Sequence, residues 1–367
     1  MEELTLELNP LEETIERWFL ELDFRKALRE NPSEYVPAAQ SQGRVTVKPV
    51  FAVHPSPSFY SASVDGIALS SSRTYGVGIF NPLRLIINKD AKFVDTGSII
   101  PEGCDAVVPI EKVNFISATE VEITKFCAPW ENVRPVGEEV AARELILPAN
   151  HRIRALDVAA LLAGGVTDVE VVKKPVVGIL PIGSGLVPAG SQPEAGKMIE
   201  TSSQIISQIV QENCCTPLPL DIVPEKIEDL LEISQKTIPD VDLLVIIAGP
   251  SLGTRPIADI IRKKGELVSY GVQLKPGMSS CFGVIEGVPV IGLPGYAMST
   301  FIIFELFGLP VLYKKLGVRM PERKSMQAYL SQNVNSPTDV TEFIRVSLSI
   351  VDGVPVAVPI SRGAHIL

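Results

Sequence analysis

The sequence is poor in histidine, in cysteine and in positive charge. Its 367 residues include three histidines and five cysteines, and 33 Lys and Arg stand against 43 Asp and Glu. The formal net charge of −10 argues against nucleic acid or an anionic membrane as a partner, because a phosphate backbone is bound by clustered Lys and Arg. The cysteines lack the paired spacing of a metal site or a redox clamp. We therefore expect free thiols and a cytoplasmic location.

Targeting and membrane segments are also missing. The first residues, MEELTLELNPLEET, are acidic and contain no apolar core before a small-residue cleavage site, so we expect no signal peptide. The longest apolar run, residues 301–312, is too short for a membrane span and contains Glu305 and Pro310. With 46% hydrophobic residues, the chain instead suits a soluble protein of two to four domains.

The usual nucleotide-binding loops are absent, although one loop matches a hydrolase motif. The sequence has neither a G-x-G-x-x-G loop after a strand nor a GK[ST] loop. Residues 249–253 fit G-x-S-x-G, the nucleophile elbow, and Asp259 and His365 follow Ser251 in the order of a catalytic triad. Because His365 falls in a different predicted domain, a serine hydrolase is a minor alternative.

A long stretch of strands and glycine-rich turns, residues 242–299, organises the rest of the chain. Residues 243–247 are uniformly apolar, which is typical of a parallel strand covered on both faces. A Gly, Pro and Ser turn follows, and then a helical pattern that ends at Gly265. The same succession recurs over residues 289–299. Because free N–H groups at such turns suit an anion, we expect these loops and the turn at residues 274–277 to form one phosphate pocket, with Lys275 as its positive charge.

The flanking segments predict an α/β fold with β additions. Strand-like and helical patterns alternate from residue 176 to residue 312, which indicates a mostly parallel sheet with helices on both faces. Residues 52–125 carry short strand-like runs separated by turn residues, and short strands return after residue 317. Asp65 and the Asp95-Thr96 pair lie in glycine turns, where a carboxylate commonly accepts hydrogen bonds from the N–H groups of the turn.

Six motifs, in order along the chain, carry a family resemblance. They are SASVDGIAL (61–69), VDTGSIIPEGCDAVVP (94–109), VRPVGEEV (133–140), AGPSLG (248–253), LKPG (274–277) and LPGYAMS (293–299). On these motifs, and over essentially its whole length, the chain resembles the MoeA-type molybdopterin molybdenumtransferases, to which the C-terminal domain of gephyrin also belongs.

The resemblance implies an α/β multidomain protein that forms a homodimer. Its four parts would be an elongated dimerisation domain (1–50 and 134–172), an inserted β domain (51–133), a three-layer α/β molybdopterin-binding domain (173–316) and a small C-terminal β-barrel-like domain (317–367). The family generally continues beyond the point matching Ser361-Arg362-Gly363. We therefore expect the last domain to be reduced or truncated.

The resemblance also implies an activity. The family inserts molybdate into adenylylated molybdopterin, with release of AMP and usually with a divalent cation such as Mg²⁺. Asp65 and Thr96 match functional positions of the family, and Glu225 stands near an expected aspartate. The implied ligand-binding positions are Gly183, Ser184, Gly249, Ser251, Gly253, Lys275, Pro276, Gly277, Pro294, Gly295 and Ser299.

The chain departs from the family pattern in its acids and in one lysine. The family's T-G-D-E-L is Ile182-Gly183-Ser184-Gly185-Leu186 here, and Pro256 stands where a further acid is expected. K-P-G-K-P becomes Lys275-Pro276-Gly277-Met278-Ser279, and P-G-N-P or P-G-Y-P becomes Pro294-Gly295-Tyr296-Ala297. Because Mg²⁺ requires oxygen ligands in near-octahedral geometry, the sequence assigns no metal ligands.

Two functions therefore stay open. The first is a divergent molybdenumtransferase that uses Asp65, Thr96, Glu225 and Lys275. The second is a non-catalytic relative that binds molybdopterin or its metal-loaded form as a carrier, sensor or partner subunit. In the second case its partner would be a molybdenum enzyme or an active paralogue.

Overall fold

The computed structural model describes residues 5–249 and 253–360, and the chain divides into two compact units. Unit 1 comprises residues 1–34, 43–45 and 172–367, and unit 2 comprises residues 35–42 and 46–171. Each unit has hydrophobic clusters of its own. The finer division into four domains stays a prediction.

Unit 1 is built around a six-stranded sheet with the order β16-β13-β17-β21-β20-β18. The first four strands run parallel: β16 (Thr216–Pro219), β13 (Val176–Ile182), β17 (Leu243–Ala248) and β21 (Val288–Pro294). The other two, β20 (Cys281–Ile285) and β18 (Glu266–Tyr270), pair antiparallel. The predicted α/β fold with a mostly parallel sheet is confirmed. Its antiparallel edge arises because a tight turn at Glu286 and Gly287, both with positive φ, folds β20 back onto β21.

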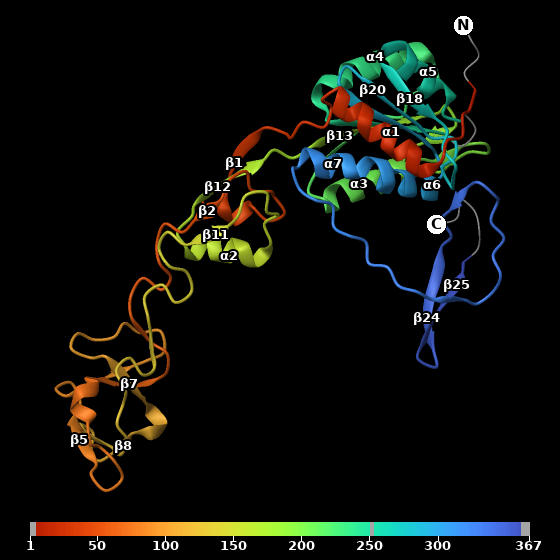
Figure 1. The fold of residues 1–367 in the computed structure, drawn as a ribbon. Coiled ribbons are helices and arrows are strands. Elements are labelled where there is room, and N and C mark those ends of the chain that lie inside the picture. Colours follow the sequence, from red (N-terminus) through yellow and green to blue (C-terminus); the bar gives the residue numbers. More distant parts are fainter. Residues whose placement is uncertain (1–4, 250–252, 361–367) are drawn as a thin grey trace. The chain divides into compact units, whose positions relative to one another are not determined.

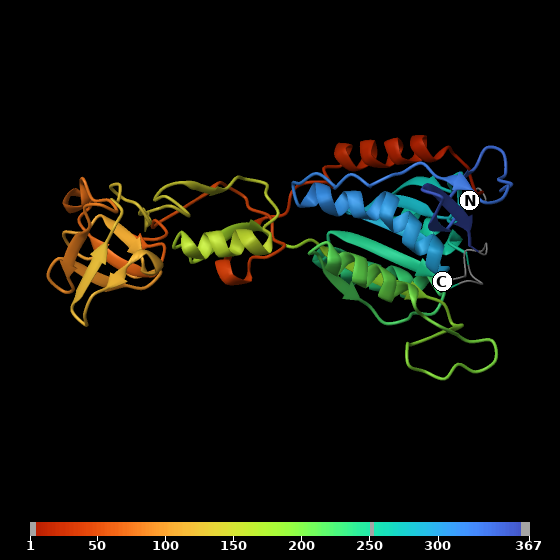
Figure 2. The ribbon, with the colours of Figure 1, turned by 90° about the horizontal axis from the view of Figure 1, so that it is seen from below.

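Helices cover both faces of this sheet (Figure 1). One face carries α1 (Leu11–Phe24), α3 (Ser202–Glu212), α6 (Ala297–Ile303) and α7 (Leu309–Lys315), which lie side by side in Figure 2, and the other carries α4 (Ile227–Thr237) and α5 (Arg255–Lys264). Alternate residues of β17 belong to the two clusters: Leu243, Val245 and Ile247 to one, and Leu244, Ile246 and Ala248 to the other. Successive residues of a strand point to opposite faces of the sheet, so an unbroken apolar run is buried only when helices cover both faces.

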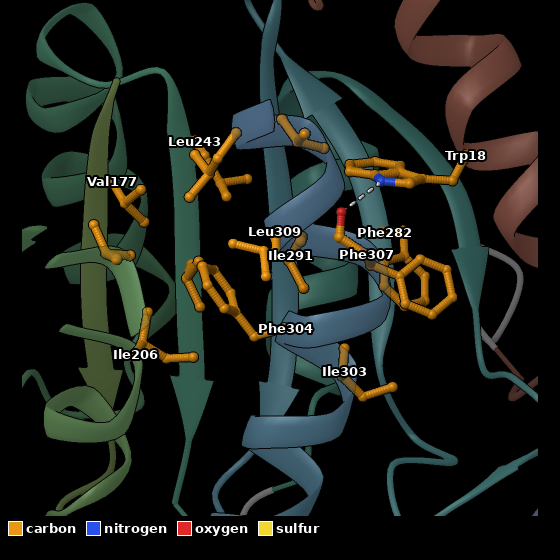
Figure 3. Close-up of a cluster of buried hydrophobic side chains, with 14 of the residues drawn as sticks. Trp18, Val177, Ile206, Leu243, Phe282, Ile291, Ile303, Phe304, Phe307 and Leu309 are labelled. Atoms are coloured by element: carbon orange, nitrogen blue, oxygen red, sulfur yellow. Dashed lines mark hydrogen bonds between the residues drawn. The ribbon is translucent and has the colours of Figure 1, made fainter. Parts of the chain in front are cut away.

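Trp18 anchors α1 in the larger of these two clusters (Figure 3). Its side chain is fully buried, and its Nε1 donates a hydrogen bond to the carbonyl oxygen of Phe307 at 3.4 Å. The ring of Phe282 lies 5.7 Å from the ring of Trp18 and stacks on Phe307 with centroids 4.0 Å apart. The prediction that residues 1–50 form one domain with residues 134–172 is therefore wrong for α1, because its apolar face is buried against the α/β sheet.

A continuous helical stretch, residues 297–315, lies in the same cluster. It runs from α6 through a π-helical turn (Phe304–Gly308) into α7. By length and composition alone this stretch could cross a membrane, but 67% of its most apolar part is buried within the protein. That burial is typical of a core helix.

Short strands complete unit 1. β14 (Leu186–Val187) pairs in parallel with β15 (Met198–Ile199), and β19 (Leu274–Lys275) pairs in parallel with β23 (Thr341–Glu342). β22 (Tyr329–Leu330), β25 (Val354–Pro359) and β24 (Val346–Val351) form a three-stranded sheet. In the described residues this open sheet stands in place of the predicted barrel-like domain.

Unit 2 consists of short strands and one helix, α2 (Ala155–Ala163). Its main sheets have the orders β6-β4-β7 and β5-β9-β8, and β2-β11 and β3-β10 form pairs. The short strands predicted over residues 52–125 are present. The strands up to β12 are β1 (Ser33–Pro37), β2 (Val50–Phe51), β3 (Ser61–Ala62), β4 (Gly66–Leu69), β5 (Leu83–Ile86), β6 (Ala91–Val94), β7 (Ala106–Pro109), β8 (Asn114–Phe115), β9 (Glu120–Ile123), β10 (Val133–Arg134), β11 (Leu145–Leu147) and β12 (Asp168–Val172).

Asp157 fixes the first turn of α2. Its buried carboxylate accepts hydrogen bonds from the backbone N–H of Arg154 at 2.8 Å and from the Arg154 guanidinium at 2.9 and 3.0 Å. Nε2 of His151 lies 2.7 Å from the same carboxylate. The Arg154 guanidinium, more than any other group, holds the pKa of Asp157 well below its usual range.

Unit 2 should consequently lose stability in acid. A carboxylate whose pKa is lowered by folding stabilises the folded state above its unfolded pKa of about 3.9, and this contribution is lost as the pH falls through the folded pKa. Asp157→Asn is expected to cost about 1–3 kcal/mol at pH 7 and to flatten the decline below about pH 4. Urea unfolding at pH 7 and at a pH below about 4 measures the free energy of unfolding of each variant. Asp168→Asn, which changes an exposed carboxylate, is the control. An equally steep acid decline in Asp157→Asn would contradict the assignment.

Candidate functional site

Three glycines meet at the carboxyl edge of the parallel strands. Gly183 follows β13, Gly249 follows β17 and Gly295 follows β21, and the last residues of these strands pair in register. A Cβ on Gly295 would lie 2.1 Å from the carbonyl oxygen of Ala248, and a Cβ on Gly249 would lie 3.7 Å from Cα of Gly183. Glycine is therefore required at position 295, and this edge, where open α/β sheets bind ligands, is lined by bare backbone.

Lys275 faces Glu342 across the β19–β23 pair. The two residues are in register, and the backbone N–H of Phe343 donates to the carbonyl oxygen of Lys275 at 2.8 Å. Nζ of Lys275 lies 3.2 Å from Oε1 of Glu342, whose side chain is 6% exposed against 52% for the lysine. Lys275, predicted from the sequence as the positive charge of the pocket, is thus ion-paired with Glu342.

A cavity of about 580 Å³, here called the lysine cavity, opens beside this pair. Its volume falls within the range of about 300–1,000 Å³ that is usual for small-molecule sites. Five predicted ligand-binding residues line it: Lys275, Pro276, Gly277, Pro294 and Ser299. The other lining residues are Leu6, Met278, Ser279, Tyr296, Met298, Ile302, Glu342, Phe343, Ile344, Arg345 and Ile360.

Arg345 supplies a second cation to the lysine cavity. Its Nη2 is buried, and no acceptor among the described residues lies within hydrogen-bonding distance of it. A buried donor without an acceptor is costly, and an anion in the cavity would provide one. Sequence reasoning missed Arg345 because FIRVSLSI indicates only a strand. The one signal available was a basic residue next to an apolar run.

A second cavity, of about 100 Å³, lies at the glycine edge and is here called the glycine cavity. It is lined by Gly249 and Gly295 and also by Leu186, Met198, Ile199, Glu200, Thr201, Ser202, Ile247, Ala248, Tyr296 and Ala297. Among residues 5–249 and 253–360, the loops predicted to form one pocket line two separate cavities, and Tyr296 lines both.

Ser184 and Glu225 contact each other on two loops of unit 1, close to the end of β13. The Ser184 hydroxyl donates to Oε1 of Glu225 at 2.9 Å, and Nζ of Lys197 donates to the Ser184 carbonyl at 2.6 Å. The backbone N–H of Glu225 itself, and then the Ser184 hydroxyl, lowers the pKa of the Glu225 carboxyl. Glu225 is thus an ionised acceptor, but neither it nor Ser184 is among the residues that line the two cavities.

Asp65 and Thr96 are brought together in unit 2. Oδ1 of Asp65 accepts hydrogen bonds from the backbone N–H and the hydroxyl of Thr96, both at 2.7 Å. The Thr96 backbone N–H, and then its hydroxyl, lowers the pKa of Asp65, and both residues are exposed. The pair presents an ionised carboxylate beside a hydroxyl at the surface of unit 2.

Asp259 is the one member of the predicted hydrolase triad that lies among the described residues. Ser251 and His365 lie outside the described residues, and Gly253 follows this gap with φ of +67°. Asp259, on α5, lies 3.2 Å from Nη2 of Arg262. The Asp259 carboxylate is therefore one member of a surface ion pair.

The two parts of the chain match two family descriptions. Residues 10–165 match the MoeA N-terminal region (domain I and II), and residues 178–314 match a probable molybdopterin binding domain. The chain belongs to the MoeA family. The suspected resemblance is therefore confirmed, and the lysine and glycine cavities both draw most of their residues from the second matched region.

Individual MoeA-type proteins resemble the chain over most of its length. A putative molybdopterin biosynthesis protein of Methanocaldococcus jannaschii is 26% identical over 345 residues, covering 90% of this chain and 83% of the relative. Molybdopterin molybdenumtransferase 2 of Mycobacterium tuberculosis is 25% identical over 335 residues, covering 85% and 82%. The crystal structure of the molybdopterin biosynthesis MoeA protein of Pyrococcus horikoshii matches with a TM-score of 0.77 and 26% identity, covering 98% of this chain and 91% of that one.

Proposed function

We propose that this protein acts in molybdenum cofactor biosynthesis, binding molybdopterin in unit 1 and inserting molybdate into its adenylylated form. The observation that carries the proposal is the lysine cavity, in which the buried Nη2 of Arg345 and the ammonium of Lys275 flank an otherwise largely apolar space. The names of the M. jannaschii and M. tuberculosis relatives support the same pathway.

The proposal divides the work between the two cavities. In the lysine cavity, Arg345 would donate to an oxyanion and Lys275 would add its charge, as guanidinium and ammonium groups do in anion sites. In the glycine cavity, Gly249 and Gly295 line the space without side chains, which would allow close approach of the organic part of the ligand. Asp65 and Thr96 stay candidate catalytic residues, and the homodimer stays part of the proposal.

A second candidate function rests on the shortage of acids. Among residues 5–249 and 253–360, no three His, Cys, Asp or Glu side chains are grouped so that they could hold a metal ion. The carboxylate that lines the lysine cavity, Glu342, is engaged with Lys275. These donors do not fit Mg²⁺, which prefers several oxygen ligands. A molybdopterin-binding carrier or sensor, partnered by a molybdenum enzyme or a paralogue, is the alternative.

The test is AMP release from adenylylated molybdopterin by the purified full-length protein. We expect release that depends on molybdate, measured by chromatography of the nucleotide with molybdate added and then withheld. Binding of the pterin, followed by its fluorescence, is measured in parallel. Saturable binding without release would support the carrier or sensor, whereas neither binding nor release would overturn the proposal altogether.

A further inference from the structure

The lysine cavity contains an ionisable group that opposes the binding of an anion. Its lining residues with ionisable side chains are Lys275, Arg345, Glu342 and Tyr296. Two of these side chains are basic, one is a carboxylic acid and one is a phenol. The carboxylate of Glu342 is also the better buried member of the Lys275 ion pair, at 6% exposure.

We propose that Glu342 is a built-in counter-ion that competes with the substrate oxyanion for Lys275. The inference rests on the proposed function. It names Glu342 as the residue that weakens the binding of the anion and sets the position of the anion in the lysine cavity. The Glu342 carboxylate lies 3.2 Å from the Lys275 ammonium. When the oxyanion enters, the ammonium turns from Glu342 to the anion, and the carboxylate remains beside it as a repulsive charge.

The backbone prevents Glu342 from leaving. Lys275 and Glu342 are register partners in the β19–β23 pair. Two backbone hydrogen bonds hold this pair: the N–H of Thr341 donates to the carbonyl oxygen of Gln273 at 3.0 Å, and the N–H of Phe343 donates to the carbonyl oxygen of Lys275 at 2.8 Å. The carboxylate therefore stays close to the lysine whether or not an anion is present. A fixed, buried charge of the same sign as the ligand acts through a low local dielectric and is screened little by salt.

This arrangement has a functional use for a transfer site. Arg345, whose buried Nη2 has no acceptor among the described residues, attracts the oxyanion, and Glu342 limits how tightly the anion is held. An oxyanion that is to be passed to a second substrate gains nothing from being bound so tightly that it cannot leave. Glu342 is thus a positioning and affinity-limiting residue.

The test is the affinity of the full-length protein for molybdate, measured by isothermal titration calorimetry. Glu342→Gln keeps the size and a hydrogen-bonding oxygen but removes the charge, and we expect it to bind molybdate about tenfold more tightly or better. Glu342→Asp should stay within about threefold of the native protein, because the charge is kept. Glu305→Gln, which removes a carboxylate paired with Arg323 outside the cavity, is the control for net charge.

The outcomes separate the inference from the proposed function. Tighter binding in Glu342→Gln alone supports the counter-ion. Binding that is unchanged or weaker in Glu342→Gln, at an unchanged melting temperature, overturns it while leaving an anion site in place. If neither the native protein nor Glu342→Gln binds molybdate, the inference fails and the lysine cavity is not a molybdate site. AMP release by the native protein then tests the proposed function separately.

Discussion

Arg345→Met is expected to weaken molybdate binding about 100-fold. A hydrogen bond to a charged group contributes about 1.5–3 kcal/mol, and 1.4 kcal/mol is a factor of ten in affinity. The buried Nη2 of Arg345 has no acceptor among the described residues, so an oxyanion would gain the full strength of this donor. Methionine keeps the apolar stem of the side chain and removes only the charge and the donors, so the walls of the lysine cavity should remain.

Calorimetric titration with molybdate measures the effect, and thermal unfolding shows whether the variant folds. Arg323→Met is the matched control, because it removes a guanidinium that is half exposed and paired with Glu305. A loss of less than about threefold in Arg345→Met, at an unchanged melting temperature, would mean that the lysine cavity is not the oxyanion site.

Gly185→Glu combined with Pro256→Asp is expected to raise molybdate-dependent AMP release by about two orders of magnitude. These are the positions where the family resemblance implies acids that the chain lacks. Carboxylates at both would supply oxygen ligands for Mg²⁺, and stabilisation of developing charge by a bound metal ion contributes several kcal/mol to a reaction of this class, where each 1.36 kcal/mol is tenfold in rate.

Both substitutions fit the structure. A Cβ on Gly185 would meet Gly196 O at 3.8 Å, which is ordinary van der Waals contact. Pro256 lies in the first turn of α5, where an aspartate interacts favourably with the helix dipole. The measurement is AMP release at increasing Mg²⁺, with Gln192→Glu, which adds a carboxylate at an exposed position, as the control. Little change in an already active protein would mean that the native site works without these acids.

The sequence predicted the elements of unit 1 well because their pattern is local. The apolar run of β17, the helix of α5 closed by Gly265, and the glycine turns that follow β17 and β21 are all encoded within a few residues. Parallel strands place their carboxyl ends at one edge, so the meeting of Gly249 and Gly295 followed from those elements alone. Asp65 and Thr96 were selected from the family resemblance and not from spacing, and their contact, across 31 residues of sequence, came from the structure.

The sequence by itself determined the α/β class of unit 1, the short strands of unit 2 and the family of the protein. Only the tertiary structure decided that α1 packs on the sheet, that the described residues of the expected pocket line two cavities and that Lys275 is paired with a counter-ion. It also placed the buried Nη2 of Arg345 at the same cavity as that pair, although Arg345 lies 70 residues from Lys275 along the chain. Periodicity and turn chemistry are local properties, whereas a counter-ion and a buried donor depend on which distant segments pack together, and no local pattern specifies that.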